Sequence, residues 1–509
     1  MLILNGRAGD RDTTSAAGGR RGRVTGVLGL GLLGVGAAVF AAGMAAGPSG
    51  LVARWGPDGP FLHWAAEPSR STVTAVSRGA AVCAGLGVVL VLWALRRGWN
   101  GIRPRVLLPA GALTAVLFAL LPPSGSIDIL NYAVYGRITD LGLDPYVMTP
   151  NELHHTGDPV GLLRPRAWAK QPTVYGPVAT AAHALAAHLG GASMGWIVFW
   201  LKVIHLMAFL ATAVMIDRLS GPEPTARVRA AVLWTANPLA LFWMVASGHV
   251  DVLAVALLTG AVFLLARRAR TGRAELVHGL AAGALAGAAV AAKVTFLFPV
   301  LGLAAACLRR PRTLAAGALG AAATVAIGYL AAGRTAIASL TQRMAHDSDL
   351  FLPIPEPLRD RSTVYSATIL LGTLATAAVL WWRLHRDTSP AAGRDRPLDV
   401  RPLIAFAIAC VVMSPVQYPW YDAAFLPLLA LLPLTRFDEA LVVRGAVLSV
   451  VLLPGIGTAP SQYEAARVAV LLFSAALVLV CLFTVRARTP APAGRAAGTG
   501  TRGWQAHRG

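Results

Sequence analysis

The sequence predicts an all-α protein that crosses a membrane many times. Of its 509 residues, 56% are hydrophobic and 14% are charged, and the mean hydropathy is +0.60. Soluble domains carry about 25% charged residues. Apolar stretches of spanning length recur along most of the chain, and arginine-rich segments fall in every second connection between them. A composition this apolar also excludes a disordered chain.

The first element is a polar, arginine-rich leader over residues 1–23, followed by an apolar stretch over 24–46. A cleaved signal peptide usually has a shorter apolar core than this. We therefore expect an uncleaved first span and a cytoplasmic amino terminus.

We expect roughly 14 spans in one membrane domain over residues 24–485. After the span at 24–46, they fall near 74–95, 105–122, 194–217, 228–247, 250–266, 277–291, 294–308, 313–331, 363–382, 402–417, 420–434, 445–460 and 465–485. Residues 486–509 are rich in Gly, Ala and Pro and are expected to form a disordered cytoplasmic tail.

The charge distribution supports this topology. Lysine occurs only at positions 170, 202 and 293, so almost all of the net charge of +21 comes from arginine. The predicted inner loops are basic, with residues such as Arg96, Arg229, Arg312, Arg436 and Arg444. This pattern follows the positive-inside rule and predicts a multi-pass plasma-membrane protein with both termini in the cytoplasm. It explains the basic composition without nucleic acid as a partner.

Two predicted outer loops are long, over residues 123–193 and 332–362, and are the first places to look for function. Residues 176–190 are apolar enough to span, but a span there would place the next basic loops outside. We expect instead a helix lying on or dipping into the outer face.

Asp128 follows the apolar stretch that ends at Leu121, which predicts a carboxylate at the outer membrane surface. Either a helix cap formed with Ser126 or a catalytic base explains an acid at that place. Tyr132, Tyr135 and Arg137 follow on a predicted amphipathic interfacial helix. The two tyrosines there favour membrane-belt positions over substrate contacts.

Further polar groups recur near the same face. The segment PTVYGP contains Tyr175. Its Gly and second Pro are typical of a helix start, but a helix start does not explain the tyrosine. A tight turn after an Asn-Pro interruption holds His249 and Asp251 at membrane depth, where ionisable groups usually have a partner or a function. One His and one Asp are too few ligands to predict a metal site.

Two lysines and an aromatic turn complete the candidates. Lys293 lies between two apolar half-stretches, and Lys202 lies inside another. Each either extends toward the interface or binds a phosphate group. Trp420 and Tyr421 lie in a predicted outer turn, and belt positions and a sugar-stacking surface explain them equally well.

Taken in order, these motifs resemble a known family. The series SxD, YxxxGR, GLDPY, PTVYGP, NPLALFWMVASGHVD, a membrane-facing lysine and SPVQYPWYDAAFLP is similar to the bacterial polyprenol-phosphomannose-dependent mannosyltransferases, which are class C multi-spanning glycosyltransferases. The likeness is greatest to the alpha-1,6-mannosyltransferases that build the mannan core of actinobacterial lipoglycans. It covers approximately residues 105–435.

The resemblance implies a class C glycosyltransferase-like fold and transfer of mannose from polyprenyl phosphomannose to a mannan or lipoglycan acceptor at the outer face. By match to SIDILNY, Asp128 would be the general base of an inverting displacement. A cation should stabilise the departing phosphate, for which Arg137, Lys202 and Lys293 are candidates. The full set of candidate substrate-binding residues is Tyr132, Arg137, Tyr175, Lys202, His249, Asp251, Lys293, Trp420 and Tyr421.

The resemblance leaves several alternatives open. No cofactor is expected, and metal dependence is open because Asp128 has no adjacent acid. The sugar could be another lipid-linked sugar, and the acceptor could be a protein, a glycan or a lipid. A transporter or flippase of polyprenyl-linked sugars would also explain the spans and the buried cations, but transporters more often show related halves and discontinuous helices at the midplane.

Overall fold

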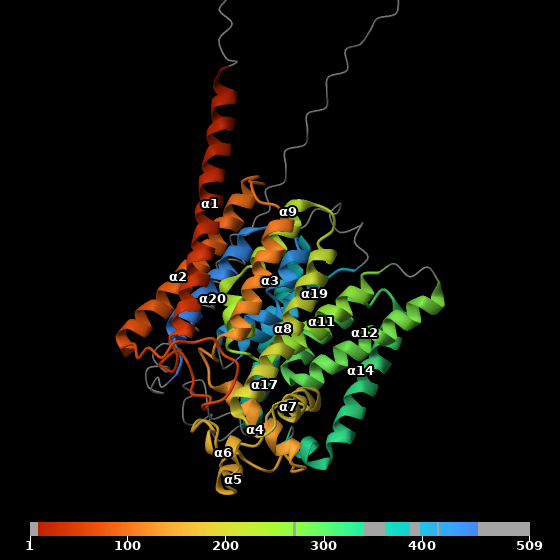
Figure 1. Cartoon of the computed structure of the whole chain (residues 1–509). Helices are drawn as coiled ribbons and strands as arrows, with labels where there is room; N and C mark the ends of the chain where they lie inside the picture. Colours follow the sequence, from red (N-terminus) through yellow and green to blue (C-terminus); the bar gives the residue numbers. More distant parts are fainter. Residues whose placement is uncertain (1–8, 268–270, 340–361, 387–397, 415–416, 457–509) are drawn as a thin grey trace, which may run out of the picture.

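The computed structural model describes residues 9–267, 271–339, 362–386, 398–414 and 417–456. Within these ranges the regular structure is helical, apart from an isolated antiparallel bridge between Val52 and Ser124 (Figure 1). The all-α prediction is therefore confirmed for the described part of the chain. The predicted tail at 486–509, the last predicted span at 465–485 and most of the 332–362 loop lie outside it.

The elements of the amino-terminal half run from the leader to the middle of the membrane domain. They are α1 (Gly9–Ala45), α2 (Arg70–Arg96), α3 (Pro104–Leu120), α4 (Asp128–Asp140), α5 (Pro150–His155), α6 (Pro159–Leu162), α7 (Pro177–Gly190), α8 (Met194–Leu219), α9 (Pro224–Leu233), α10 (Pro238–Leu241) and the π-helical η1 (Phe242–Ala246).

The carboxy-terminal half adds further helices and three short 3₁₀ segments. They are α11 (Asp251–Leu265), α12 (Gly272–Ala292), η2 (Val294–Phe296), α13 (Leu297–Ala306), α14 (Pro311–Ala332), α17 (Ser362–Arg386), α19 (Arg401–Met413), η4 (Pro419–Ala424), η5 (Leu428–Leu431) and α20 (Arg436–Leu452).

Six described helices are long and apolar enough to cross a membrane. They are α1 from Arg21 onward, α2, α8, α12, α14 and α17 from Ala367 onward. A seventh span results if α9 and the α10–η1 segment, which are bent by 43°, count as one broken helix. Helices α3, α11 and α19, and the η2–α13 segment, are apolar but shorter. The chain is thus a polytopic membrane protein, and the expected total of roughly 14 spans stays a prediction.

Two predicted spans in the carboxy-terminal half were wrong. Residues 420–434 form η4 and η5 instead of one helix, because Pro419, Pro427 and Pro433 interrupt the apolar run. The span predicted at 445–460 begins earlier, at Arg436, where Thr435 and Asp438 form a capping box. It ends at Leu452, before Pro454.

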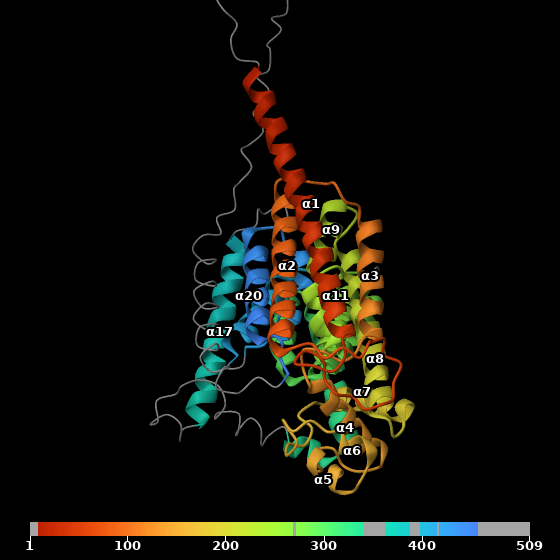
Figure 2. The ribbon, with the colours of Figure 1, turned by 60° about the vertical axis from the view of Figure 1, so that its left-hand side comes forward.

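Helix α4 is buried among other helices on nearly all sides, which corrects its predicted amphipathic character. All but four of its residues are buried, Tyr132 and Tyr135 included, so neither tyrosine is a membrane-belt residue. Helix α7 covers α4 closely, because a Cβ atom at Gly136 would overlap the carbonyl group of His183. Helices α4 to α7 gather at one end of the bundle, opposite the end from which α1 protrudes (Figures 1 and 2).

Two predicted details of the chain path, a separate helix near residues 176–190 and a division of residues 277–308, are confirmed, whereas the position of that helix at the outer face stays a prediction. Residues 177–190 form the 14-residue helix α7, which packs on α4 and α8. The 277–308 region is divided into α12 and the η2–α13 segment, and the division falls at Lys293, whose backbone is extended. This break places Lys293 at the same end of the bundle as α4 and α7.

Candidate functional site

Asp128 is the first residue of α4, and its side chain is 23% exposed. Its backbone N–H donates a hydrogen bond to Ser126 Oγ at 3.1 Å. Burial raises the pKa of the carboxyl group from 3.8 to about 6, while the nearby positive charge of Lys293 and the contact with Ser126 oppose this rise. A carboxylate with a pKa of about 6 is well suited to accept a proton near neutral pH.

His249 lies beside Asp128. It follows Gly248, which has φ +66° and lies so close to Ile129 that a Cβ atom would overlap that side chain. The His249 Nδ1 atom lies 3.6 Å from Asp128 Oδ2, beyond hydrogen-bond distance. The imidazole is fully buried, and its nitrogens make no hydrogen bond to a described residue.

Asp251 and Lys293 form an ion pair beside these groups. The Lys293 Nζ atom donates to Asp251 Oδ1 at 2.7 Å and lies 4.2 Å from the centre of the Tyr421 ring. The second carboxylate oxygen of Asp251 is buried and has no hydrogen-bond partner among the described residues. Unsatisfied buried polar atoms of this kind usually bind water or a ligand.

Tyr175 and Tyr132 form another side of the same site. Their hydroxyl groups are 3.1 Å apart, and the Tyr132 ring stacks on His183 at 4.8 Å. Next to Tyr175, Gly176 donates its N–H to the carbonyl group of Ala292 at 3.2 Å, and a Cβ atom there would overlap the carbonyl group of Ala291. The PTVYGP segment therefore packs against the end of α12, directly before Lys293.

Trp420 and Tyr421 close the site from the carboxy-terminal half. Trp420 is buried, and its ring stacks on His249 at 3.8 Å and on Tyr418 at 4.2 Å. The His249 and Tyr418 rings thus cover the faces of the Trp420 ring on which a sugar would stack. Tyr421 is partly exposed below the Lys293 ammonium group.

Arg137 and Lys202 do not join this cluster. Arg137 pairs with Asp158 at 3.0 Å and with Asp140 at 3.2 Å. Lys202 is fully buried and donates to the carbonyl groups of Phe118, at 2.8 Å, and Leu121. The structure thus uses both side chains in intramolecular contacts.

Two arginines counted as inner-loop charges are in fact buried, which corrects the sequence interpretation. Arg444 is fully buried in α20 and bonds Asp422 and Gln417. Arg229 bonds Asp438 and two main-chain carbonyl groups. Sequence reasoning missed Arg444 and Gln417 as neighbours of the site. The only available signal was that an arginine in an apolar helix requires a buried partner.

The carboxylates and imidazoles do not form an evident metal site. Within the described ranges, no three His, Cys, Asp or Glu side chains lie close enough together to hold a metal ion. Whether the protein requires a metal stays open, as in the sequence interpretation.

Comparison with known proteins gives one match. The model of a family described as alpha-(1->6)-mannopyranosyltransferase, N-terminal domain, matches residues 23–309. No curated protein and no solved structure matches the chain. The matched region is more than half of the chain and contains Asp128, His249, Asp251 and Lys293, whereas Trp420 and Tyr421 lie beyond it.

Proposed function

Because the chain belongs to the alpha-(1->6)-mannopyranosyltransferase family, we propose that it transfers mannose from polyprenyl phosphomannose to a mannan or lipoglycan acceptor. In this proposal the reaction takes place at the outer face of the plasma membrane, which we assign to the end of the bundle formed by α4 and α7. The observation that carries this proposal is the pairing of a base and a cation at one end of the bundle. Asp128 has a pKa of about 6, and Lys293 is close enough to influence it electrostatically.

The proposed chemistry is an inverting single displacement. An acceptor hydroxyl oxygen attacks the anomeric carbon and forms the new glycosidic bond, while Asp128 takes the hydroxyl proton. The bond between the anomeric carbon and the phosphate oxygen breaks, and its electron pair leaves with the polyprenyl phosphate. Charge builds up on that oxygen, so a preorganised cation at this place accelerates the reaction.

Lys293 is the proposed phosphate contact. Among Arg137, Lys202 and Lys293, it is the one whose charge acts on the partly exposed Asp128, and its ammonium group lies 4.2 Å from the centre of the Tyr421 ring. Asp251 holds the ammonium group through one oxygen and has a second, unpaired oxygen for the substrate. Tyr175 is partly exposed and is a proposed substrate contact, whereas Tyr132 and His249 are buried and support the site from within the protein.

The test is sugar transfer by membranes that contain the full chain. Polyprenyl-phosphate-linked mannose and a short alpha-1,6-mannoside are supplied, with lipid-linked glucose, galactose and arabinose in parallel. We expect elongation with mannose, and a fall of about 100- to 10,000-fold in Asp128→Asn at equal abundance. Repeating the assay with EDTA tests for a metal requirement.

Asp58→Asn is the matched control, because Asp58 is an exposed acid in the loop that follows α1. It should retain full transfer. Transfer that is retained in Asp128→Asn would remove the assignment of the base. Absence of transfer with every lipid-linked sugar, despite good expression, would favour a transporter of such lipids.

A further inference from the structure

The short segment Gln417–Tyr421 contacts two side chains of the proposed site, His249 and Lys293. Trp420 stacks on His249 at 3.8 Å, and the Tyr421 ring lies 4.2 Å from the Lys293 ammonium group. The position of this segment therefore fixes both the imidazole beside Asp128 and the cation beside Asp251. The segment is not helical at Gln417 and Tyr418, so its position depends on contacts from other elements.

Arg444 supplies those contacts from α20. Its guanidinium group donates to Gln417 on one side of the segment and to Asp422 on the other. Gln417 in turn donates to the carbonyl groups of Val411 and Val412, at 3.0 and 3.1 Å, and caps the end of α19. The buried Arg444 thus bonds the chain on both sides of Trp420 and Tyr421.

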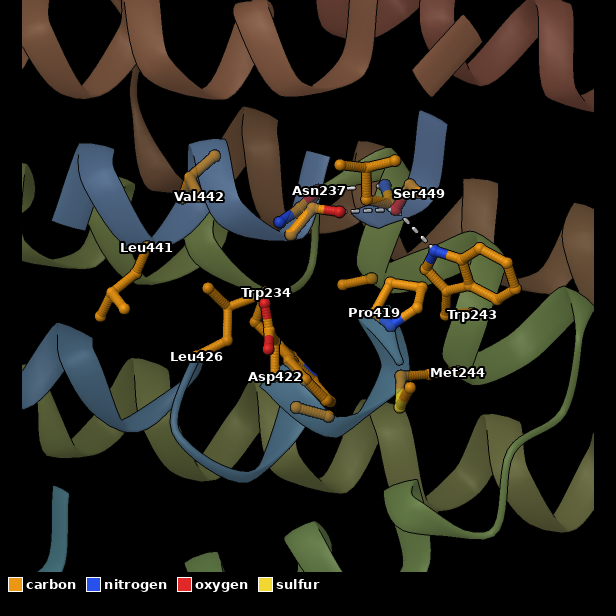
Figure 3. Close-up of a pocket in the computed structure, with 14 residues that line it drawn as sticks. Trp234, Asn237, Trp243, Met244, Pro419, Asp422, Leu426, Leu441, Val442 and Ser449 are labelled. Carbon is orange, nitrogen blue, oxygen red and sulfur yellow. Dashed lines mark hydrogen bonds between the residues drawn. The ribbon is translucent and has the colours of Figure 1, made fainter. Parts of the chain in front are cut away.

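A cavity lies between this segment and α20 (Figure 3). Pro419 and Asp422 line it, together with Trp243, Asn237 and Ser449. It leaves about 30 Å³ for the centres of water molecules, which is room for about two waters. Asp422 Oδ2 is buried beside it and makes no hydrogen bond to a described residue.

Because of this cavity, the position of the segment depends on its contacts with Arg444. Interiors are normally close-packed, so a loosened segment has nowhere to go. Here free space adjoins Pro419 and Asp422, and a segment that lost its anchor could shift into that space and withdraw Trp420 from His249. Removing the arginine would also leave Asp422 as an uncompensated buried acid.

We propose that Arg444 is a positioning residue of the active site. It holds Gln417–Tyr421 so that His249 stays against Asp128 and Lys293 stays where the lipid phosphate departs. The catalytic part of this inference rests on the proposed function. Arg444 lies outside residues 23–309, so the family match does not include it.

Arg229 provides a matched control. It is also a buried arginine that bonds an aspartate and main-chain carbonyl groups, and it anchors the η5 end of the same irregular stretch. A purely structural role predicts that Arg444→Lys and Arg229→Lys lose stability alike and keep equal turnover per folded molecule. A positioning role predicts that only the Arg444 variant changes the site.

The first measurement needs no sugar transfer. Acrylamide quenching of tryptophan fluorescence is recorded for the full chain and each variant, with and without Trp420→Phe, so that the contribution of Trp420 is obtained by difference. We expect Trp420 to become more accessible in Arg444→Lys and in Asp422→Asn, and to stay protected in Arg229→Lys. Unchanged protection in both site variants, or equal exposure in the Arg229 variant, would overturn the proposal.

The second measurement is steady-state transfer by folded protein. A misplacement of about 1 Å costs about 100-fold in rate, so we expect kcat of Arg444→Lys to fall by about that factor, with little change in KM for the acceptor. Wild-type kcat in a variant with exposed Trp420 would refute the link to catalysis. If the wild-type chain transfers no sugar, the proposed function fails, and the quenching result still decides whether Arg444 positions the segment.

Discussion

Lys202 and Lys293 occupy similar sequence contexts but different structural environments. Each is a single lysine in an apolar stretch. Lys202 lies within α8 and is fully buried against the carbonyl groups that end α3. Lys293 lies at the break after α12, and its ammonium group is held by Asp251 over the Tyr421 ring.

The difference shows what decides the role of a membrane lysine. A lysine inside a continuous helix must satisfy its donors with whatever the neighbouring elements supply, which here is main-chain carbonyl oxygen. A lysine at a helix break can face a polar site, and a carboxylate partner keeps it charged and oriented. We infer that Lys293 acts on substrate and that Lys202 holds the end of α3 and the connection to Asp128.

The largest expected effect is the loss of the Lys293 charge. Lys293→Met removes the cation proposed to stabilise the leaving phosphate, and the loss of one such preorganised group costs about 100- to 1,000-fold in kcat. The assay is transfer from lipid-linked mannose at equal amounts of folded protein. Lys293→Arg restores a positive charge and should recover part of the rate. A Lys293→Met variant with normal kcat would end the distinction between the two lysines.

The pH dependence should separate the two lysines next. Asp128 accepts a proton only when it is ionised, so the rate should fall about tenfold per pH unit below its pKa, which is about 6. The positive charge of Lys293 lowers this pKa. Lys293→Arg should therefore leave the acid limb, the fall in rate on the acidic side of the pH–rate profile, at nearly the same pH. Lys293→Met should move the acid limb to higher pH. Lys202→Met should leave the limb unchanged. An acid limb that shifts in Lys202→Met but not in Lys293→Met would contradict the assignment of Lys293 as the cation that acts on Asp128.

Lys202→Met should instead reduce stability. It leaves the buried carbonyl groups of Phe118 and Leu121 without their donor, and each loss of this kind costs about 1–3 kcal/mol. The expected result is a lower unfolding temperature of the purified protein, with unchanged kcat for the molecules that remain folded. A stable Lys202→Met protein that fails to turn over would place Lys202 in the reaction.

The sequence predicted those parts of the site that depend on local pattern. The apolar run that ends at Leu121 indicated where α3 ends, and the interrupted run at Lys293 indicated the helix break. The pairing of Asp251 with Lys293, 42 positions apart, was not predictable, because it arises from the packing of α11 on α12. The same holds for Arg444, which sequence position alone makes indistinguishable from an inner-loop charge.

The wrong spans have a local cause as well. Residues 420–434 are apolar enough to cross a membrane, but hydropathy takes no account of prolines spaced six to eight residues apart. Trp420, Tyr421 and Asp422 lie in η4, at the start of the irregular stretch that results.

The smallest expected effect concerns Arg137, the third candidate cation. Its guanidinium group is partly exposed and pairs with Asp140 and Asp158, and ion pairs of this kind contribute about 1 kcal/mol or less. Arg137→Ala should lower the unfolding temperature slightly and leave both kcat and the acid limb unchanged. The same transfer and unfolding measurements apply, with Arg137→Lys as the matched variant. If Arg137→Ala instead lost turnover without losing stability, a second cation would act on substrate, and a helix break would not be the feature that selects such residues.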